Sequence, residues 1–198
     1  PGFGRMTLDE LCGHQKASYL GFKAGDPDVV VGWNALTNDI SNKHVSAIAK
    51  NKAWSYYDTM NWHCYWNFPQ SGWENLRKIA YGQPIWMTET DNHMNGDADT
   101  DPWYDADIER ESLKAADLVM SYSIMMHRGI NRNFNFILGP FGTGLKLLRM
   151  DKTPRAGYVA LAGMGRLLAG AEFIGRMPQE QDKYYHVYAY DAEPDGID

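Results

Sequence analysis

Residues 84–89 read Pro-Ile-Trp-Met-Thr-Glu, an apolar run that ends in a carboxylate. A short apolar run without polar alternation is typical of a strand in a parallel sheet that is covered on both faces. Helices are predicted on both sides of it. Residues 71–74 (Ser-Gly-Trp-Glu) have the form of a capping box that opens the preceding helix, and a long helix is predicted over about 107–128, stopped by Gly129. The stretch therefore predicts one strand in an alternating series of strands and helices.

The same alternation extends in both directions along the chain. Further strands are predicted over 29–31, 56–62 and 134–138, and further helices over about 8–24 with Thr7 and Glu10 as a capping box and Gly25 as its end, over 42–51, and from a Thr153 cap to Gly170. Four strand–helix units are half of a (β/α)8 barrel, which takes roughly 250 residues in full. The expected fold is therefore α/β, the C-terminal half (about strands 5 to 8) of a TIM barrel.

The predicted domain organisation has two parts. The partial barrel is expected over residues 1–176. From Tyr184 to Tyr190 the sequence becomes aromatic-rich and strand-like without a following helix. Residues 177–198 are therefore expected to form a linker and the first strand of a C-terminal β-sandwich-like module.

Composition excludes several classes of function. The chain has 198 residues, 44% of them hydrophobic, and 19 basic against 25 acidic residues give a net charge of -6. Such a balance predicts a globular protein rather than a disordered one. Without clustered basic residues, no nucleic-acid partner is expected, and without an apolar run of roughly 20 residues no membrane span is expected. Cys12 and Cys64 form no Cys-x-x-Cys pair, which disfavours a disulfide scaffold or a thiolate zinc site.

The carboxyl ends of the strands are the places to look for chemistry, because the reactive groups of parallel α/β barrels lie there. Glu89 ends an apolar strand. A carboxylate in that position is costly to desolvate unless neighbours bind its charge. Position alone leaves two interpretations open: a functional carboxylate, or a Glu that pairs with a helix lysine or caps a loop.

Four segments resemble one family. Residues 84–89 resemble the seventh-strand signature of the superfamily of retaining glycoside hydrolases with (β/α)8 barrels (clan A type), in which a strand containing Trp and Thr ends in the nucleophilic Glu. Residues 58–65 resemble its sixth strand, which ends in His-x-Tyr. Residues 26–31 resemble the phrase that leads into its fifth strand, and 153–158 resemble its last helix. Order and spacing agree over roughly residues 1 to 175.

One departure from the superfamily concerns the eighth strand, which usually ends in Trp. Here that region contains Phe134, Phe136 and Phe141 and no Trp. The individual family is therefore not assigned.

The resemblance implies cleavage of O-glycosidic bonds in an oligo- or polysaccharide by double displacement, with Glu89 as nucleophile and no cofactor. It also implies an acid/base Glu in an Asn-Glu-Pro phrase, of which Pro1 would be the last residue. The 198-residue chain is then expected to be catalytically incomplete, and the exposed edges of a half-barrel favour association. A secreted or periplasmic location is a further implication.

Several residues at the strand ends are expected to bind substrate. His63 would contact the sugar or Glu89, and Tyr65 would donate a hydrogen bond that keeps Glu89 ionised. Sugar faces pack on aromatic rings, so aromatic platforms are expected at the strand-end tryptophans Trp33, Trp62 and Trp66. Asn34 is expected either to bind a sugar hydroxyl or to cap its loop.

Two other classes of function compete with this one. A metal-dependent barrel hydrolase would use His63, Glu89, Asp91 and His93, but a metal needs three or four converging ligands and Glu89 and Asp91 are only two residues apart on one strand edge. The other class is a carbohydrate-binding barrel that has lost catalysis. Presence of the acid/base Glu would distinguish it from a glycosidase.

The acidic loop 97–107 alternates carboxylates as a calcium-binding loop does. It departs from the EF-hand template, because Pro102 stands where Gly is needed and Ile108 stands where the bidentate Glu is needed. A solvated loop whose last Asp caps the next helix is the alternative.

Overall fold

The chain forms two compact units, each of which is described separately. The computed structural model describes residues 6–37, 40–65, 70–91, 108–139, 146–177 and 188–192. Unit 1 comprises Pro1–Thr90 and Ile130–Phe134, and unit 2 comprises Asp91–Gly129 and Asn135–Asp198.

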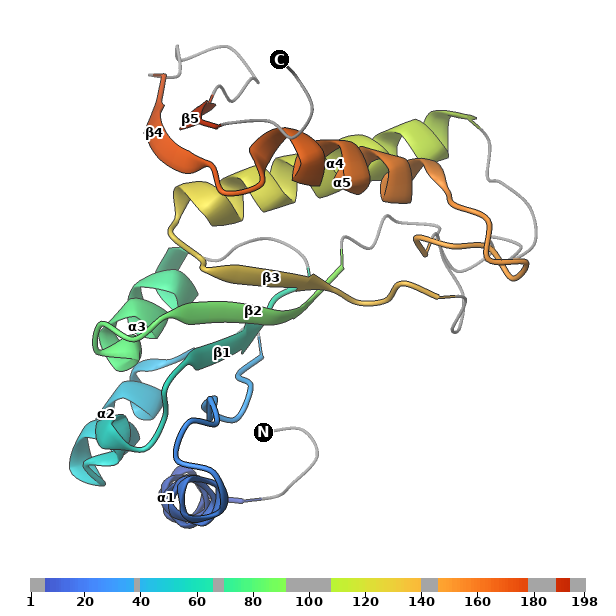
Figure 1. The fold of residues 1–198 in the computed structure, drawn as a ribbon. Helices are drawn as coiled ribbons and strands as arrows, with labels where there is room; N and C mark the ends of the chain where they lie inside the picture. The colour runs from blue at the N-terminus through green and yellow to red at the C-terminus, as the bar shows by residue number, and fades with distance from the viewer. Residues whose placement is uncertain are drawn as a thin grey trace. The chain divides into compact units, whose positions relative to one another are not determined.

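Unit 1 contains a small sheet with strand order β1-β2-β3, in which β1 and β2 are parallel and the arrows of all three strands point the same way (Figure 1). Its elements are α1 (Leu8–Gly25), α2 (Asn42–Lys50), the 3-10 helix η1 (Ala53–Ser55), β1 (Met60–His63), α3 (Gln70–Ala80), β2 (Ile85–Thr90) and β3 (Arg132–Asn135). Met60 lies opposite Ile85 and Trp62 opposite Met87, but His63 lies opposite Glu89, because the register shifts between Trp62 and His63.

The start of α1 is confirmed and its predicted end is wrong. The Thr7 hydroxyl accepts a hydrogen bond from the Glu10 backbone N–H at 3.2 Å, and the Glu10 carboxylate accepts one from the Thr7 N–H at 2.7 Å. This is the predicted capping box. Gly25 is not a left-handed cap but the last helical residue, and Asp26 caps the helix with an extended backbone. Pro27 explains this, because a residue before proline is restricted to extended conformations.

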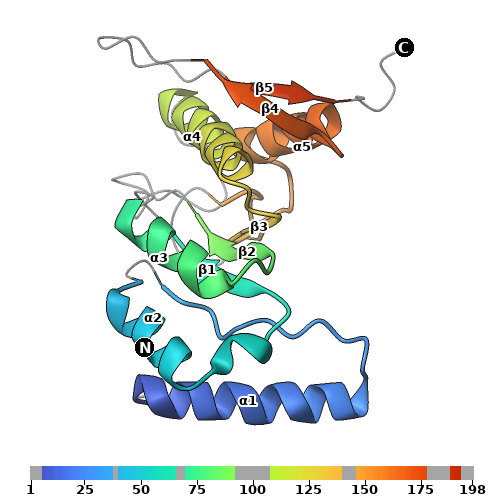
Figure 2. The same ribbon diagram turned by 90° about the vertical axis from the view of Figure 1, so that its left-hand side faces the viewer.

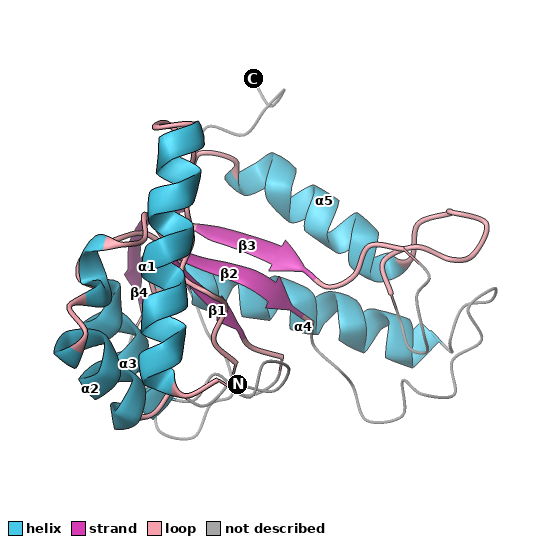
Figure 3. Cartoon of the chain, turned by 90° about the horizontal axis from the view of Figure 1, so that it is seen from below, coloured by secondary structure: helices cyan, strands magenta, loops and turns pink. Residues whose placement is uncertain are grey.

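The core of unit 1 lies against one face of β1 and β2. Along both strands buried residues alternate with half-buried ones, up to the half-buried pair Thr88–Glu89. Helix α3 packs against β1, and α2 packs against α3 (Figure 3). Among the described residues of unit 1, the largest fully buried side chains are Trp33, Ile40, Ile48, Tyr57, Met60, Trp62, Leu76, Ile79 and Met87. The half-buried face is therefore the one that leaves polar groups within reach of solvent.

Tyr57→Phe is expected to lower the free energy of unfolding by about 1–2 kcal/mol, because the buried Tyr57 hydroxyl donates a hydrogen bond to the Ile79 carbonyl. Burial also raises the pKa of this phenol, so it remains a donor at all working pH values. Urea unfolding measures the change. Tyr19→Phe is the matched control, because the Tyr19 hydroxyl lies 3.4 Å from Asp58 in a less buried position. Equal losses in the two variants would contradict the expected role of burial.

Unit 2 combines a helix pair with a two-stranded antiparallel sheet. Its elements are α4 (Ile108–His127), α5 (Ala156–Leu168), β4 (Glu172–Arg176) and β5 (Tyr188–Asp191), and β4 pairs with β5 (Figure 2). The helices approach closely at Gly157, where an added Cβ would lie 2.9 Å from Leu118 Cδ1. Gly129 and Gly170 have φ values of 77° and 71° and follow α4 and α5 as predicted.

The predicted half-barrel is wrong. The described residues form a three-stranded parallel sheet in one unit and a two-stranded antiparallel sheet in the other, rather than four strand–helix units in one continuous sheet. The division at residue 176 stays a prediction, although the β4 and β5 pair joins residues on its two sides. None of the helices in the described ranges combines the length and apolar character that crossing a bilayer requires.

The strand predicted over 29–31 does not form, because side chains take its backbone hydrogen bonds. The Asp58 carboxylate accepts from the Val31 N–H at 2.8 Å, and the Lys23 ammonium donates to the Val29 carbonyl at 2.7 Å. The following segment forms isolated bridges from Gly32 to Thr59, just before β1, and from Leu36 to Trp62 of β1. The apolar run therefore indicated the burial of Val31, but it did not indicate whether these residues pair with a neighbouring strand.

Other predicted boundaries also shift. Helix α3 begins at Gln70, so the Ser71 capping box is not its start. Helix α5 is capped by Arg155 rather than by Thr153, whose backbone N–H and hydroxyl instead bond the Asp151 carboxylate. Strand β3 begins two residues before the predicted start of 134.

Acidification below pH 6.5 is expected to destabilise unit 2 through His127. Burial, and then the positive charges of Arg176 and Arg128, lower the pKa of His127 from 6.5. The centroid of its ring lies 4.8 Å from that of Phe173 and 5.4 Å from that of Tyr188. Because the folded pKa is the lower one, this contribution is present above the unfolded pKa and is lost as the pH falls through the folded value. Urea unfolding between pH 7.5 and 5.5 should therefore show a steeper loss in the wild type than in His127→Gln. Parallel losses would contradict this.

Candidate active site at the ends of β1 and β2

A carboxylate and an imidazole meet where β1 and β2 end. His63 Nδ1 lies 3.1 Å from Glu89 Oε2, and the two side chains are 23% and 24% exposed. His63 is the last residue of β1, and Glu89 is the residue before the last of β2. Sequence analysis placed both residues in the candidate site, and the structure brings them together.

Backbone and hydroxyl hydrogen bonds join the two strand ends beside this pair. The Cys64 N–H donates to the Glu89 carbonyl at 3.2 Å, and the buried Thr90 hydroxyl donates to the Cys64 carbonyl at 2.7 Å. The register shift leaves Thr88 as an extra residue on β2, which is what sets Glu89 opposite His63. These contacts were not foreseen from the sequence, which carries no local pattern for a bulge.

The arrangement suits an oriented carboxylate. An ionised carboxylate only accepts hydrogen bonds, so Nδ1 has to carry a proton whenever His63 donates to Glu89. The imidazole lies beside Oε2, while the carboxylate, whose side chain is 24% exposed, can still be approached from solvent. Such a group can act as a nucleophile or as a general base.

The remaining predicted site residues lie in different environments. Asn34 is exposed, and its backbone N–H is held by the Gln15 side chain at 3.2 Å. Tyr65 is half-buried. Trp33 and Trp62 are 2% and 0% exposed, so the structure does not present their rings as platforms for a sugar.

Trp66, also predicted to be a platform, lies outside the described residues, as do His93 and the acidic loop 97–107. Their predicted roles stay predictions.

Asp91, a ligand in the competing metal-site hypothesis, is engaged by two lysines. Lys114 Nζ lies 2.7 Å from its Oδ1 and Lys146 Nζ lies 3.2 Å from its Oδ2, and the three side chains are 2–9% exposed. Two ammonium groups on the two carboxylate oxygens compete with a metal ion. In the part of the chain that the structure describes, no group of three or more His, Cys, Asp or Glu residues has the arrangement of a metal site.

The buried cluster of Asp91, Lys114 and Lys146 is a feature that sequence analysis missed. Burial and the Asp91 charge raise the pKa of Tyr122, on the same helix as Lys114, to about 12. A second buried ion pair in unit 2 joins Arg155 Nη1 to Glu111 Oε1 at 2.7 Å. The sequence of α4 contains a pattern that could have predicted these buried charges, because Glu111 and Lys114 lie on the same side of the helix as the buried Leu118.

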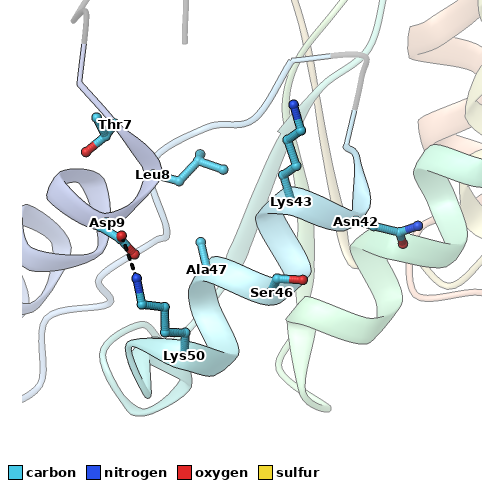
Figure 4. Close-up of a pocket in the computed structure, with 8 residues that line it drawn as sticks. All are labelled: Thr7, Leu8, Asp9, Asn42, Lys43, Ser46, Ala47 and Lys50. Carbon is cyan, nitrogen blue, oxygen red and sulfur yellow. Dashed lines mark hydrogen bonds and ion pairs between the residues drawn. The ribbon is translucent and has the colours of Figure 1, made fainter.

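A groove of about 570 Å³ lies elsewhere in unit 1, between the start of α1 and one face of α2 (Figure 4). Its lining residues are Thr7, Leu8, Asp9, Asn42, Lys43, Ser46, Ala47 and Lys50. Lys50 is bound to Asp9 at 2.8 Å. The groove contains none of the predicted site residues, so chemistry rather than volume places the candidate site at His63 and Glu89.

Comparison with models of known families, with curated proteins and with solved structures finds no match to this chain.

Proposed function

We propose that the chain carries the nucleophile of a retaining glycosidase that acts on an oligo- or polysaccharide, and that Glu89 is this nucleophile. The observation that supports the proposal most is the 3.1 Å contact between His63 Nδ1 and Glu89 Oε2 at the ends of neighbouring parallel strands. The resemblance of the two strands to the glycosidase signatures predicted the same two residues. Action outside the cytoplasm is part of the proposal.

In the first chemical step a Glu89 oxygen attacks the anomeric carbon of the sugar. A bond forms between the carboxylate and that carbon, and the bond from the carbon to the leaving oxygen breaks with its electron pair. His63 holds Oε2, so Oε1 is the oxygen proposed to attack. Water then cleaves the ester in the second step. In a retaining mechanism a second carboxyl group protonates the leaving oxygen.

Trapping the ester tests the proposal. The probes are dinitrophenyl glycosides of glucose, mannose, galactose and xylose that carry fluorine in place of the hydroxyl next to the anomeric carbon. Dinitrophenolate leaves without a proton, so the first step needs no general acid, and fluorine slows the second step so that the ester accumulates. Intact-mass and peptide mass spectrometry are expected to find one added fluorosugar, on Glu89.

Glu89→Gln is the matched control and is expected to remain unlabelled, because the amide is a poor nucleophile of nearly the same shape. A label on another residue, or equal labelling of Glu89→Gln, would overturn the proposal. So would absence of labelling with all four sugars at saturating concentration, which is the result expected of a binding protein without catalysis.

A further inference from the structure

We infer that Thr90 is a positioning residue for the His63–Glu89 pair, and that it acts through the carbonyl of Cys64. The inference deepens the proposed function by naming a group that sets the nucleophile's geometry without touching substrate. Thr90 is 3% exposed, and its hydroxyl donates to the Cys64 carbonyl at 2.7 Å.

The hydrogen bond from Thr90 to Cys64 joins the two residues that directly follow Glu89 and His63 in the chain. Thr90 follows Glu89 directly, and Cys64 follows His63 directly. The Cys64 N–H donates to the Glu89 carbonyl at 3.2 Å, so two hydrogen bonds clamp the Cys64 peptide groups against the end of β2. A shift of the Cys64 carbonyl would move the backbone of His63 and thereby its imidazole.

The hydrogen bond from Thr90 to Cys64 is important because the register of β1 and β2 shifts next to it. Regular parallel pairing ends at Trp62 and Met87, and Thr88 is then the extra residue. A bulge disrupts the ladder locally, so side-chain hydrogen bonds have to replace part of it. Thr90 supplies such a bond from a buried position with low freedom to move.

The tautomer of His63 reports on this geometry without any substrate. Donation of a hydrogen bond to Glu89 requires the proton on Nδ1, whereas a neutral imidazole in water favours the Nε2–H form. Nitrogen-15 NMR of the histidine-labelled chain distinguishes the two forms. The chain has six histidines, and His63→Gln assigns the relevant signal. Wild type is expected to show His63 as Nδ1–H, and Glu89→Ala is expected to lose that signal.

Three substitutions at Thr90 test the positioning role. Thr90→Val keeps the shape without the hydroxyl, Thr90→Ala removes the hydroxyl and the methyl group, and Thr90→Ser keeps the hydroxyl. We expect Thr90→Val and Thr90→Ala to lose the Nδ1–H signal and Thr90→Ser to retain it. Circular dichroism identifies any variant that fails to fold, and the comparison of Thr90→Ala with Thr90→Ser remains decisive if Thr90→Val does not fold. Retention of the Nδ1–H signal in folded Thr90→Ala or Thr90→Val, or its loss in folded Thr90→Ser, would overturn the inference.

The labelling rate with the fluoroglycosides separates this inference from the proposed function. If Glu89 is labelled, Thr90→Val and Thr90→Ala are expected to slow the labelling by on the order of tenfold to a hundredfold, because small misplacements of a reacting group have effects of this size. Thr90→Ser is expected to be labelled at the wild-type rate. Absence of labelling in every form would overturn the proposed function, while the NMR comparison would still decide the role of Thr90.

Discussion

Glu89→Ala is expected to release dinitrophenolate from the activated glycosides at least on the order of a thousandfold more slowly than the wild type. The reason is that the attacking oxygen is removed while the contacts that bind the sugar remain, and loss of a nucleophile affects the chemical step rather than binding. Release is measured by absorbance under saturating substrate. Glu172→Ala, which removes an exposed carboxylate from β4, is the control and is expected to keep the wild-type rate.

Azide distinguishes loss of the nucleophile from loss of the fold. In Glu89→Ala the anion can enter the space of the missing carboxylate and attack the anomeric carbon from the same side. The rate is then expected to rise with azide concentration, and the product is expected to be a glycosyl azide of inverted configuration. Full activity of Glu89→Ala without azide would contradict the assignment of the nucleophile.

Asp91→Ala is expected to lower the free energy of unfolding by about 3–5 kcal/mol, the usual effect of removing one member of a buried ion pair. The Asp91 carboxylate contacts both Lys114 and Lys146, and all three side chains are nearly inaccessible to solvent. Without this carboxylate, two ammonium groups lose the anion that compensates for their desolvation. Urea unfolding followed by circular dichroism measures the difference.

The matched control is Asp9→Ala, which breaks an aspartate–lysine pair of similar length at the surface. Asp9 lies 2.8 Å from Lys50, and both side chains are more than half exposed. Water solvates both charges when such a pair is lost, so the unfolding midpoint is expected to change little. A small effect of Asp91→Ala, similar to that of Asp9→Ala, would contradict the role assigned to the buried cluster.

Local signals predicted local structure well. Thr7 and Glu10 form the predicted capping box, and Gly129, which was predicted to stop α4, follows the helix with a φ of 77°. Both features depend on neighbours within one turn of the chain. The structure also brings His63 and Glu89 together at the ends of adjacent strands, and their roles in the site stay predictions.

The long-range arrangement was predicted less well, because it depends on contacts between residues that are far apart in the sequence. The apolar run 29–31 contains no information about Asp58, whose carboxylate takes the Val31 N–H that a ladder would have used. The exposure of Trp62 depends on packing against other elements rather than on its place at a strand end. The alternation of strands and helices similarly predicted the order of many elements. It contains no information on which strands pair, and the strands of the described residues form two separate sheets.

The register shift between β1 and β2 has a consequence for how this chain tolerates change over evolutionary time. One additional residue, Thr88, is what sets Glu89 rather than its neighbour opposite His63. Side-chain replacements along either strand leave that spacing intact, whereas deletion or insertion of a single residue within a strand would turn the following side chains of that strand to the other face. Lineages that descend from this sequence should therefore keep Glu89, Thr90 and the number of residues within each strand, while the side chains of 85–88 change more freely.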